Sequence, residues 1–318
     1  MAESDNSFSV MPDLRRRMPR IDSRWLWAWR LWYRLRGLWR HARVSRLMTR
    51  VLGPQYRRSR DMIEIDITYL CNLHCLNCNR SVTQAREAMH MPLEQVTSFV
   101  DQSIERGKRW RRIRVLGGEP TLHPRFDEVM RELLRYKAAV PSTIIEVVTN
   151  GYGARVKNTL SKLPPELMID NTRKESPIQP TFGPFNMAPI DDRRYRGSAF
   201  ANGCAVLEDC GMGLTPMGYY PCAVAGGIDR ILRDDIGVKD LPTDDDDMTK
   251  AAERLCGLCG RFRDGHYIPK PLRPELVEDK VSVTWQRLYA NWHRAKAGAP
   301  RQGLGAEVDT PEDREVSR

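Results

Sequence analysis

The stretch IEIDITYLCNLHCLNC, residues 63–78, decides the fold of this 318-residue chain. Its first part, Ile63–Thr68, alternates apolar and polar residues, a pattern typical of a β-strand. Three cysteines follow in a C-x3-C-x2-C spacing: Cys71, Cys75 and Cys78. Three thiolates on one short loop can hold three irons of a cubane iron–sulfur cluster and leave the fourth iron open to another molecule.

A second motif begins 35 residues after Cys78. The apolar run Ile113–Leu116 predicts another strand, which leads directly into the segment Gly-Gly-Glu-Pro at residues 117–120. For the cysteine triplet alone, a structural zinc site is the alternative interpretation. A zinc site has no use for this glycine pair, whereas a missing Cβ lets backbone groups approach a ligand closely.

Together, the two motifs resemble those of the radical S-adenosylmethionine (SAM) enzymes, over roughly residues 61–265. The fold of that family is a full or partial barrel of β/α units. The resemblance implies that Cys71, Cys75 and Cys78 ligate a [4Fe-4S] cluster and that SAM binds its open iron. It also implies these SAM-site residues: Gly117, Gly118, Glu119 and, after the third strand, Asn150. The pair Asn-Gly after a strand is equally a turn signal.

The similarity weakens after the third predicted strand, Thr143–Val148. Only about fifty residues separate Gly151 from Cys204, too few for the two or more remaining β/α units. A helix over Ala154–Leu163 and a strand near residues 167–169 fit the pattern. We therefore expect an α/β fold with an abbreviated, partial (β/α) barrel. Asn77 also departs from the family, which commonly has an aromatic residue there, near the adenine edge of SAM.

A second group of cysteines follows the barrel segment. Two of them flank a hairpin pattern with Gly218 at its turn, and two more have a C-x2-C spacing. This arrangement resembles the twitch domain, a short form of the SPASM extension that carries an auxiliary cluster in some radical SAM enzymes. The resemblance implies a second [4Fe-4S] cluster with the ligands Cys210, Cys222, Cys256 and Cys259. A structural zinc ion on the same thiolates is the alternative.

One cysteine, Cys204, is left over, and three interpretations of it stay open. A lone cysteine is usually a small buried apolar residue. Cys204 could instead replace Cys210 as a ligand, or it could be catalytic and donate a hydrogen atom to a substrate radical, as a cysteine does in radical SAM epimerases. A radical that passes its electron to an auxiliary cluster gives an oxidised product, whereas a radical quenched by a thiol keeps its oxidation state.

The positive charge of the chain is concentrated near its start. Residues 14–60 contain fifteen arginines and one acid, a net charge of +14, although the whole chain carries only +10. Trp25, Trp29, Trp32 and Trp39 recur at helical spacing within this segment, which predicts an amphipathic helix with interfacial aromatic residues. The helix could lie on an anionic membrane surface, pack its tryptophans on the barrel, or bind nucleic acid, the least favoured partner.

We accordingly expect four parts: a basic amphipathic segment (1–60), the partial barrel (61–200), a twitch-like part (201–268), and a C-terminal helix with a disordered tail (269–318). Clustered cysteines without a secretory signal favour metal over disulfides and a cytoplasmic location, peripheral to the inner face of the membrane if the basic helix binds there.

The family resemblance implies hydrogen abstraction from a substrate, with electrons from a donor such as flavodoxin or ferredoxin. We expect oxidation or epimerisation of a carbohydrate, aminocyclitol or lipid-linked glycan, as twitch-bearing dehydrogenases of aminoglycoside pathways perform. Modification of a peptide or protein is the alternative within the family. A metal-stabilised nucleic-acid or membrane-binding protein without catalysis is the alternative outside it.

Overall fold

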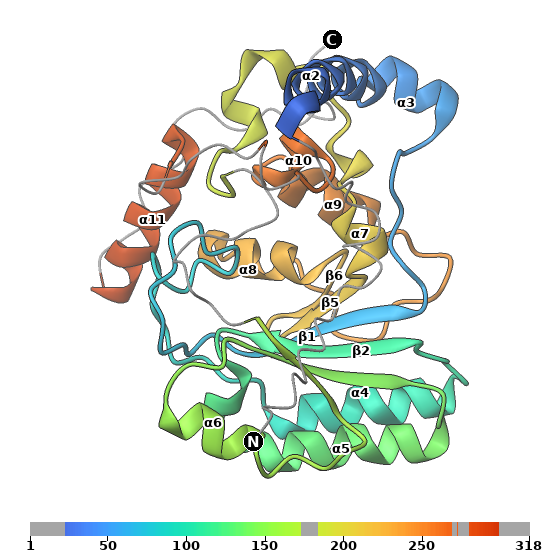
Figure 1. The fold of residues 1–318 in the computed structure, drawn as a ribbon, viewed down its shortest axis with the longest axis vertical. Helices are drawn as coiled ribbons and strands as arrows, with labels where there is room; N and C mark the ends of the chain where they lie inside the picture. The colour runs from blue at the N-terminus through green and yellow to red at the C-terminus, as the bar shows by residue number, and fades with distance from the viewer. Residues whose placement is uncertain (1–22, 173–183, 269–271, 273–279, 299–318) are drawn as a thin grey trace.

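One six-stranded sheet organises the chain, in the strand order β4-β3-β2-β1-β5-β6 (Figure 1). The structure, a computed structural model, describes residues 23–172, 184–268, 272 and 280–298. The strands are β1 (Met62–Thr68), β2 (Arg112–Gly117), β3 (Ile144–Thr149), β4 (Met168–Asn171), β5 (Met212–Thr215) and β6 (Gly218–Tyr220). The larger helices are α2 (Leu26–Arg43), α3 (Arg46–Leu52), α4 (Leu93–Glu105), α5 (Phe126–Ala139), α6 (Ala154–Leu160), α8 (Ala223–Leu232), α9 (Thr249–Cys256) and α11 (Val283–Lys296).

The first four strands form three β/α units, because α4, α5 and α6 connect consecutive parallel strands. Ile63, Ile65 and Ile67 of β1 are fully buried in the core that α4 and α5 cover, below the sheet in Figure 1. Alternate residues must then face the other side of the sheet. The partial barrel is confirmed, and it is open: β4 is its edge strand within the described residues.

The twitch-like part joins the same sheet. β5 pairs in parallel with β1, with Ile63 opposite Met212 and Ile65 opposite Leu214. β6 then returns antiparallel, and Thr215 pairs with Gly218 at the predicted hairpin turn. Above the sheet lie α8 and α9 with two short helices, α7 (Val206–Asp209) and α10 (Arg261–Asp264) (Figure 1). The predicted parts 61–200 and 201–268 therefore share one sheet.

The C-terminal helix packs on this upper layer. Trp285, Leu288 and Trp292 of α11 are buried in the core that contains Ile228 of α8. The Trp285 indole N–H also donates to the Leu258 carbonyl at 2.7 Å. The apolar stripe of α11 is therefore packing surface; the predicted disordered tail lies outside the described residues.

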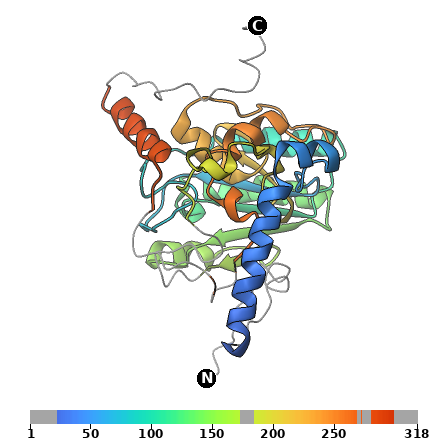
Figure 2. The same ribbon diagram turned by 90° about the horizontal axis from the view of Figure 1, so that it is seen from above.

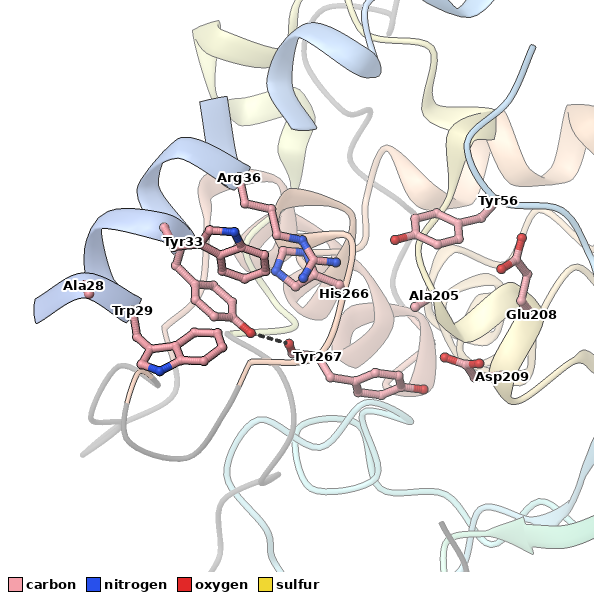
Figure 3. Close-up of a pocket in the computed structure, with 11 residues that line it drawn as sticks. Ala28, Trp29, Tyr33, Arg36, Tyr56, Ala205, Glu208, Asp209, His266 and Tyr267 are labelled. Carbon is pink, nitrogen blue, oxygen red and sulfur yellow. Dashed lines mark hydrogen bonds between the residues drawn. The ribbon is translucent and has the colours of Figure 1, made fainter. Parts of the chain in front are cut away.

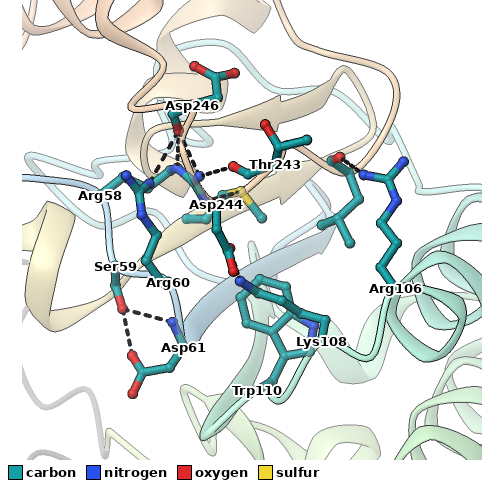
Figure 4. A network of polar contacts seen from close by, with 12 residues as sticks. Arg58, Ser59, Arg60, Asp61, Arg106, Lys108, Trp110, Thr243, Asp244 and Asp246 are labelled. Carbon is teal, nitrogen blue, oxygen red and sulfur yellow. Dashed lines mark hydrogen bonds and ion pairs between the residues drawn. The ribbon is translucent and has the colours of Figure 1, made fainter.

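The segment that contains the acidic run Asp244–Asp247 contacts the linker that leads from the basic segment into β1, through hydrogen bonds and an ion pair (Figure 4). The Arg58 guanidinium donates to the Asp246 carbonyl at 3.0 and 2.7 Å and to the Thr243 carbonyl at 2.8 Å. Arg60 pairs with Asp247. These contacts offset part of the positive charge of the linker.

The basic segment forms α2, which runs along the periphery of the molecule (Figure 2). It is followed by α3, whose first turn is capped by Ser45 accepting from the Met48 N–H at 3.3 Å. No helix among the described residues has both the length and the apolarity needed to cross a bilayer.

One glycine controls how closely β5 can approach β1. Gly211 has a φ of +85°, and a Cβ there would lie 2.1 Å from the Met62 carbonyl oxygen. The neighbouring atom is backbone, so it cannot rotate away. Glycine is therefore required where the twitch-like part meets the barrel.

We expect Gly211→Ala to lower the free energy of unfolding by about 2 kcal/mol or more, because it adds a backbone clash at a left-handed residue. Gly37→Ala is the matched control, since no neighbouring atom lies within 4 Å of the Cβ that it would add and alanine favours the interior of α2. Urea denaturation of both variants under anaerobic conditions measures the difference; equal stabilities would contradict the assignment.

Candidate functional site

The loop after β1 carries the three predicted cluster ligands. Cys71, Cys75 and Cys78 are each partly exposed, and burial raises the pKa of Cys71 to about 11, with smaller contributions from the other two thiols. Within the described residues, no three cysteine, histidine or carboxylate side chains already converge as metal ligands would. The loop fits a cubane cluster in its donor chemistry, three soft thiols on one short segment.

Neighbouring segments hold this loop in place. The Thr83 hydroxyl donates to the Cys75 carbonyl at 2.9 Å, and the Asn72 amide donates to the Tyr152 carbonyl at 2.7 Å. Asn77, which stands where the family commonly has an aromatic residue, has a φ of +52° and accepts a hydrogen bond from the Phe185 N–H. Asn77 therefore joins the loop to the segment that covers the sheet.

The two predicted SAM-site glycines pack against backbone of the protein itself. A Cβ on Gly117 would lie 2.1 Å from the Thr68 carbonyl oxygen, and one on Gly118 would lie 2.2 Å from the Leu70 carbonyl oxygen. The Gly118 N–H donates to the Thr68 carbonyl at 2.7 Å. The sequence predicts that the absence of a Cβ at these glycines makes room for a ligand. In the structure, the space is filled by the backbone that leads into the cysteine loop.

Glu119 connects the ends of two strands. Its buried carboxylate accepts the Asn150 N–H at 2.8 Å, the Thr149 hydroxyl at 2.9 Å and the Thr121 hydroxyl at 2.7 Å. The Asn150 side-chain amide in turn lies 3.8 Å from the Cys71 sulfur. The structure thus brings all four predicted SAM-site residues to the carboxyl ends of β1–β3, beside the cysteine loop. Ligands of open parallel sheets bind at this edge.

Four other cysteines line one small buried cavity of about 20 Å³ in the twitch-like part. They are Cys204, Cys222, Cys256 and Cys259. Burial raises the pKa of each thiol, to about 12 for Cys204. Arg261 lines the same cavity, and its charge opposes the raised pKa of Cys259. Four soft donors beside a buried cation fit an anionic metal cluster.

The predicted ligand Cys210 lies elsewhere. It follows α7, whereas Cys204 precedes that helix, and its sulfur lies 3.8 Å from the Tyr267 hydroxyl. Its raised pKa comes first from burial and then from the charge of Glu64 on β1, so Cys210 faces the barrel side of the twitch-like part. Among the described residues, the thiol that shares a cavity with Cys222, Cys256 and Cys259 is Cys204, which agrees with the alternative that Cys204 replaces Cys210 as a ligand.

The inward face of the sheet is charged, a feature absent from the expectations based on sequence. Arg80 pairs with Glu64 at 2.9 Å and with Asp66 at 3.0 Å. Arg114 pairs with Glu64, with Glu146 at 3.3 Å and with Asp170 at 3.6 Å. All six side chains are buried. The sequence of β1 contained a sign of this charged face. Every second residue of the strand is polar, although both faces of the sheet are covered.

Glu146 differs from the other members of this network. Burial raises its pKa from 4.5 to about 7, against the opposing charge of Arg114, while Asp170 adds to the increase and Arg112 opposes it. Its Oε1 atom has no hydrogen-bond partner among the described residues. A buried carboxylate oxygen without a partner is an acceptor for a hydroxyl or an amine.

A separate cavity of about 680 Å³ lies between α2 and the twitch-like part (Figure 3). Aromatic rings, Arg36 and two carboxylates line it: Trp29, Trp32, Tyr33, Tyr56, His266, Tyr267, Glu208 and Asp209. The Tyr33 hydroxyl spans it to donate to the Tyr267 carbonyl at 3.5 Å. It contains none of the predicted site residues.

Comparison with known proteins identifies the class. Residues 65–166 match the family described as the radical SAM superfamily, so this part of the chain is a radical SAM domain. The family implies a [4Fe-4S] cluster and SAM as cofactors. The GTP 3',8-cyclase of Sulfurimonas denitrificans is 29% identical over 115 residues, or 36% of this chain and 34% of that protein. That of Chlorobaculum tepidum is 32% identical over 103 residues, or 32% and 29%. The chain therefore spans about one third of the length of these curated relatives.

Two solved structures are also similar. BtrN in complex with AdoMet and 2-DOIA is 18% identical, covers 64% of this chain and 94% of its own, and has a TM-score of 0.40. SuiB of Streptococcus suis bound to S-adenosylmethionine is 17% identical, with coverage of 38% and 26% and a TM-score of 0.26. Both similarities are too distant to bear on function.

The raised pKa of Glu146 predicts a pH-dependent contribution to stability. Between about pH 4.5 and 7 the folded state holds a proton that the unfolded state has lost, so stability decreases as the pH rises through this window. Glu146→Gln cannot titrate. Its stability relative to the wild type should therefore increase by up to about 3 kcal/mol from pH 4.5 to 7 and then level off.

Urea denaturation of the two proteins at matched pH values measures this difference, and contributions from other groups cancel. Glu166→Gln, at an exposed position, is the control substitution. A difference between Glu146→Gln and the wild type that stays constant across this pH range would refute the assignment.

Proposed function

We propose that this radical SAM protein oxidises a polar, hydroxyl- or amine-bearing substrate such as a carbohydrate, an aminocyclitol or a lipid-linked glycan. The observation that carries the proposal is the cavity lined by Cys204, Cys222, Cys256 and Cys259. When bound, the first cluster with SAM supplies a hydrogen-abstracting 5'-deoxyadenosyl radical, and a cluster in this cavity supplies a one-electron acceptor.

The charged inward face supports a polar substrate. Four buried carboxylates there share the guanidinium groups of Arg80 and Arg114, and the Glu146 Oε1 atom is an open acceptor. Hydroxyl and amine groups are donors that such carboxylates bind well, and closure over the face would exclude water from the reacting carbon. An apolar substrate would leave the Glu146 Oε1 atom without a partner.

The grouping of the thiols favours oxidation over epimerisation. If Cys204 is a ligand, it is not available as a hydrogen donor. The cluster that Cys204, Cys222, Cys256 and Cys259 would hold would then supply the acceptor for one electron of the substrate radical, and a base would take the proton. Epimerisation is the second candidate, because Cys210 stays a protonated thiol beside Glu64 on the barrel side. In that case Cys210, and not Cys204, would return the hydrogen atom.

The activities of the relatives support the reaction class alone. The matched stretch covers only about one third of the length of the GTP 3',8-cyclases, so the remainder of those proteins has no counterpart in the comparison. Peptide modification and a purely binding role are the remaining alternatives. A cytoplasmic enzyme with a flavodoxin- or ferredoxin-like electron donor is part of this proposal, since exposed clusters need a reducing compartment.

The reaction class is tested by SAM cleavage. We expect the protein, reconstituted anaerobically with iron and sulfide and then reduced, to convert SAM to 5'-deoxyadenosine. The variant in which Cys71, Cys75 and Cys78 are all replaced by alanine should lose roughly 100-fold or more of this rate, because the open iron is no longer held. Chromatography of the nucleoside products measures the rates. Two zinc ions per chain and no cleavage by the wild type would exclude the proposal.

The ligand set is tested by iron content. We expect about eight irons per chain in the wild type and in Cys210→Ser, but about four in Cys204→Ser. The reason is that, of these two cysteines, Cys204 lines the four-thiol cavity and Cys210 does not. If instead Cys210→Ser held about four irons and Cys204→Ser about eight, the ligands would be those predicted from the sequence: Cys210, Cys222, Cys256 and Cys259. Candidate sugars and aminocyclitols deuterated at single carbons then identify the substrate, through deuterium transferred to 5'-deoxyadenosine.

A further inference from the structure

One apolar stripe of α2 points away from the protein. Trp27, Leu31, Leu35, Leu38 and Trp39 are each between 50% and 69% exposed. Their spacing places them on one stripe of the helix, since residues three, four and seven apart share a face. The stripe continues on α3, which exposes Leu47, Val51 and Leu52.

The opposite face of α2 anchors the helix with polar groups. Arg40 is buried and donates to the Gly203 carbonyl at 2.5 Å and to the Phe262 carbonyl at 3.0 Å. Arg43 donates to the Gly53 carbonyl at 2.9 Å. The orientation of the helix is therefore set by arginines that face inward. The tryptophans of α2 are divided between two faces: Trp29 and Trp32 line the cavity against the twitch-like part, whereas Trp27 and Trp39 are exposed.

The surface around the apolar stripe is strongly cationic. Residues 23–60 contain eleven arginines and no acidic residue. Arg30 and Arg34 are exposed beside the stripe on α2, and Arg46 and Arg50 are exposed on α3. The acidic run Asp244–Asp247 contacts only the end of this segment, at Arg58 and Arg60.

We propose that the exposed face of α2 and α3 binds the surface of an anionic lipid bilayer. An interfacial helix needs an apolar stripe with tryptophan to enter the headgroup region and flanking cations to pair with lipid phosphates. Both are present on one face, and its charge complements an anionic membrane. The proposal is independent of the reaction, because none of these side chains lies at the cysteine loop.

Two other occupants fit the surface less well. A nucleic acid would pair with the arginines but would leave the leucines in water, because base and phosphate groups offer them no apolar partner. A second copy of the chain would cover the leucines but would bring two segments with eleven arginines each together, and like charges repel.

The experiment is co-sedimentation of the full-length, cluster-loaded protein with vesicles. We expect binding to vesicles of phosphatidylcholine mixed with phosphatidylglycerol, and little binding to phosphatidylcholine alone. Leu31→Glu with Leu35→Glu should lower the partition coefficient roughly tenfold or more, by placing charges in the apolar stripe. Arg30→Gln with Arg34→Gln should lower it roughly thirtyfold, by removing two cations from the anionic surface.

Val283→Glu is the matched control, because Val283 is also more than half exposed but lies on α11. It should bind vesicles like the wild type, and all variants should cleave SAM at the wild-type rate without lipid, which verifies their folding. Equal pelleting of the wild type and the Leu31/Leu35 variant would overturn the proposal. Binding to an RNA oligonucleotide or dimerisation in sedimentation velocity, without vesicle binding, would also overturn it.

Discussion

The close approach of two backbone segments, residues 68–70 and 117–118, is the constraint on which the candidate site depends. The carbonyls of Thr68 and Leu70 occupy the positions where side chains of Gly117 and Gly118 would be, so no other residue type fits without moving backbone. This contact fixes where the cysteine loop leaves β1. Glu119 then extends the same edge to β3 by holding Asn150.

The buried charges of the inward face point to binding chemistry more than to stability. Replacing a buried ion-pair network by apolar residues is often neutral or stabilising, so the charged side chains in this position are weak support for the fold. They give the interior of the open barrel hydrogen-bonding groups in a water-poor setting. Cys222 of the four-cysteine cavity lies close enough to Arg80 and Glu64 for their charges to influence its pKa.

Much of the barrel could be predicted from the sequence, because alternation and glycine placement act locally. The strand at residues 62–68, the helix after Gly153 and the hairpin at Gly218 follow from such patterns. The choice between Cys204 and Cys210 does not, since it depends on which end of the four-residue helix α7 faces the cavity. The orientation of α2 also escaped prediction, because a helical pattern defines two faces without saying which one packs.

The inward arginines of α2 connect the surface helix to the redox part of the molecule. Arg40 lies close enough to Cys204 and Cys256 for their charges to influence its pKa, which burial lowers. It also stacks on Phe262, with 4.8 Å between the guanidinium carbon and the ring centre. A lysine could not reproduce this planar, bidentate arrangement. Arg40 therefore links the orientation of α2 to the surroundings of the four-cysteine cavity, where Arg261 supplies a second buried cation.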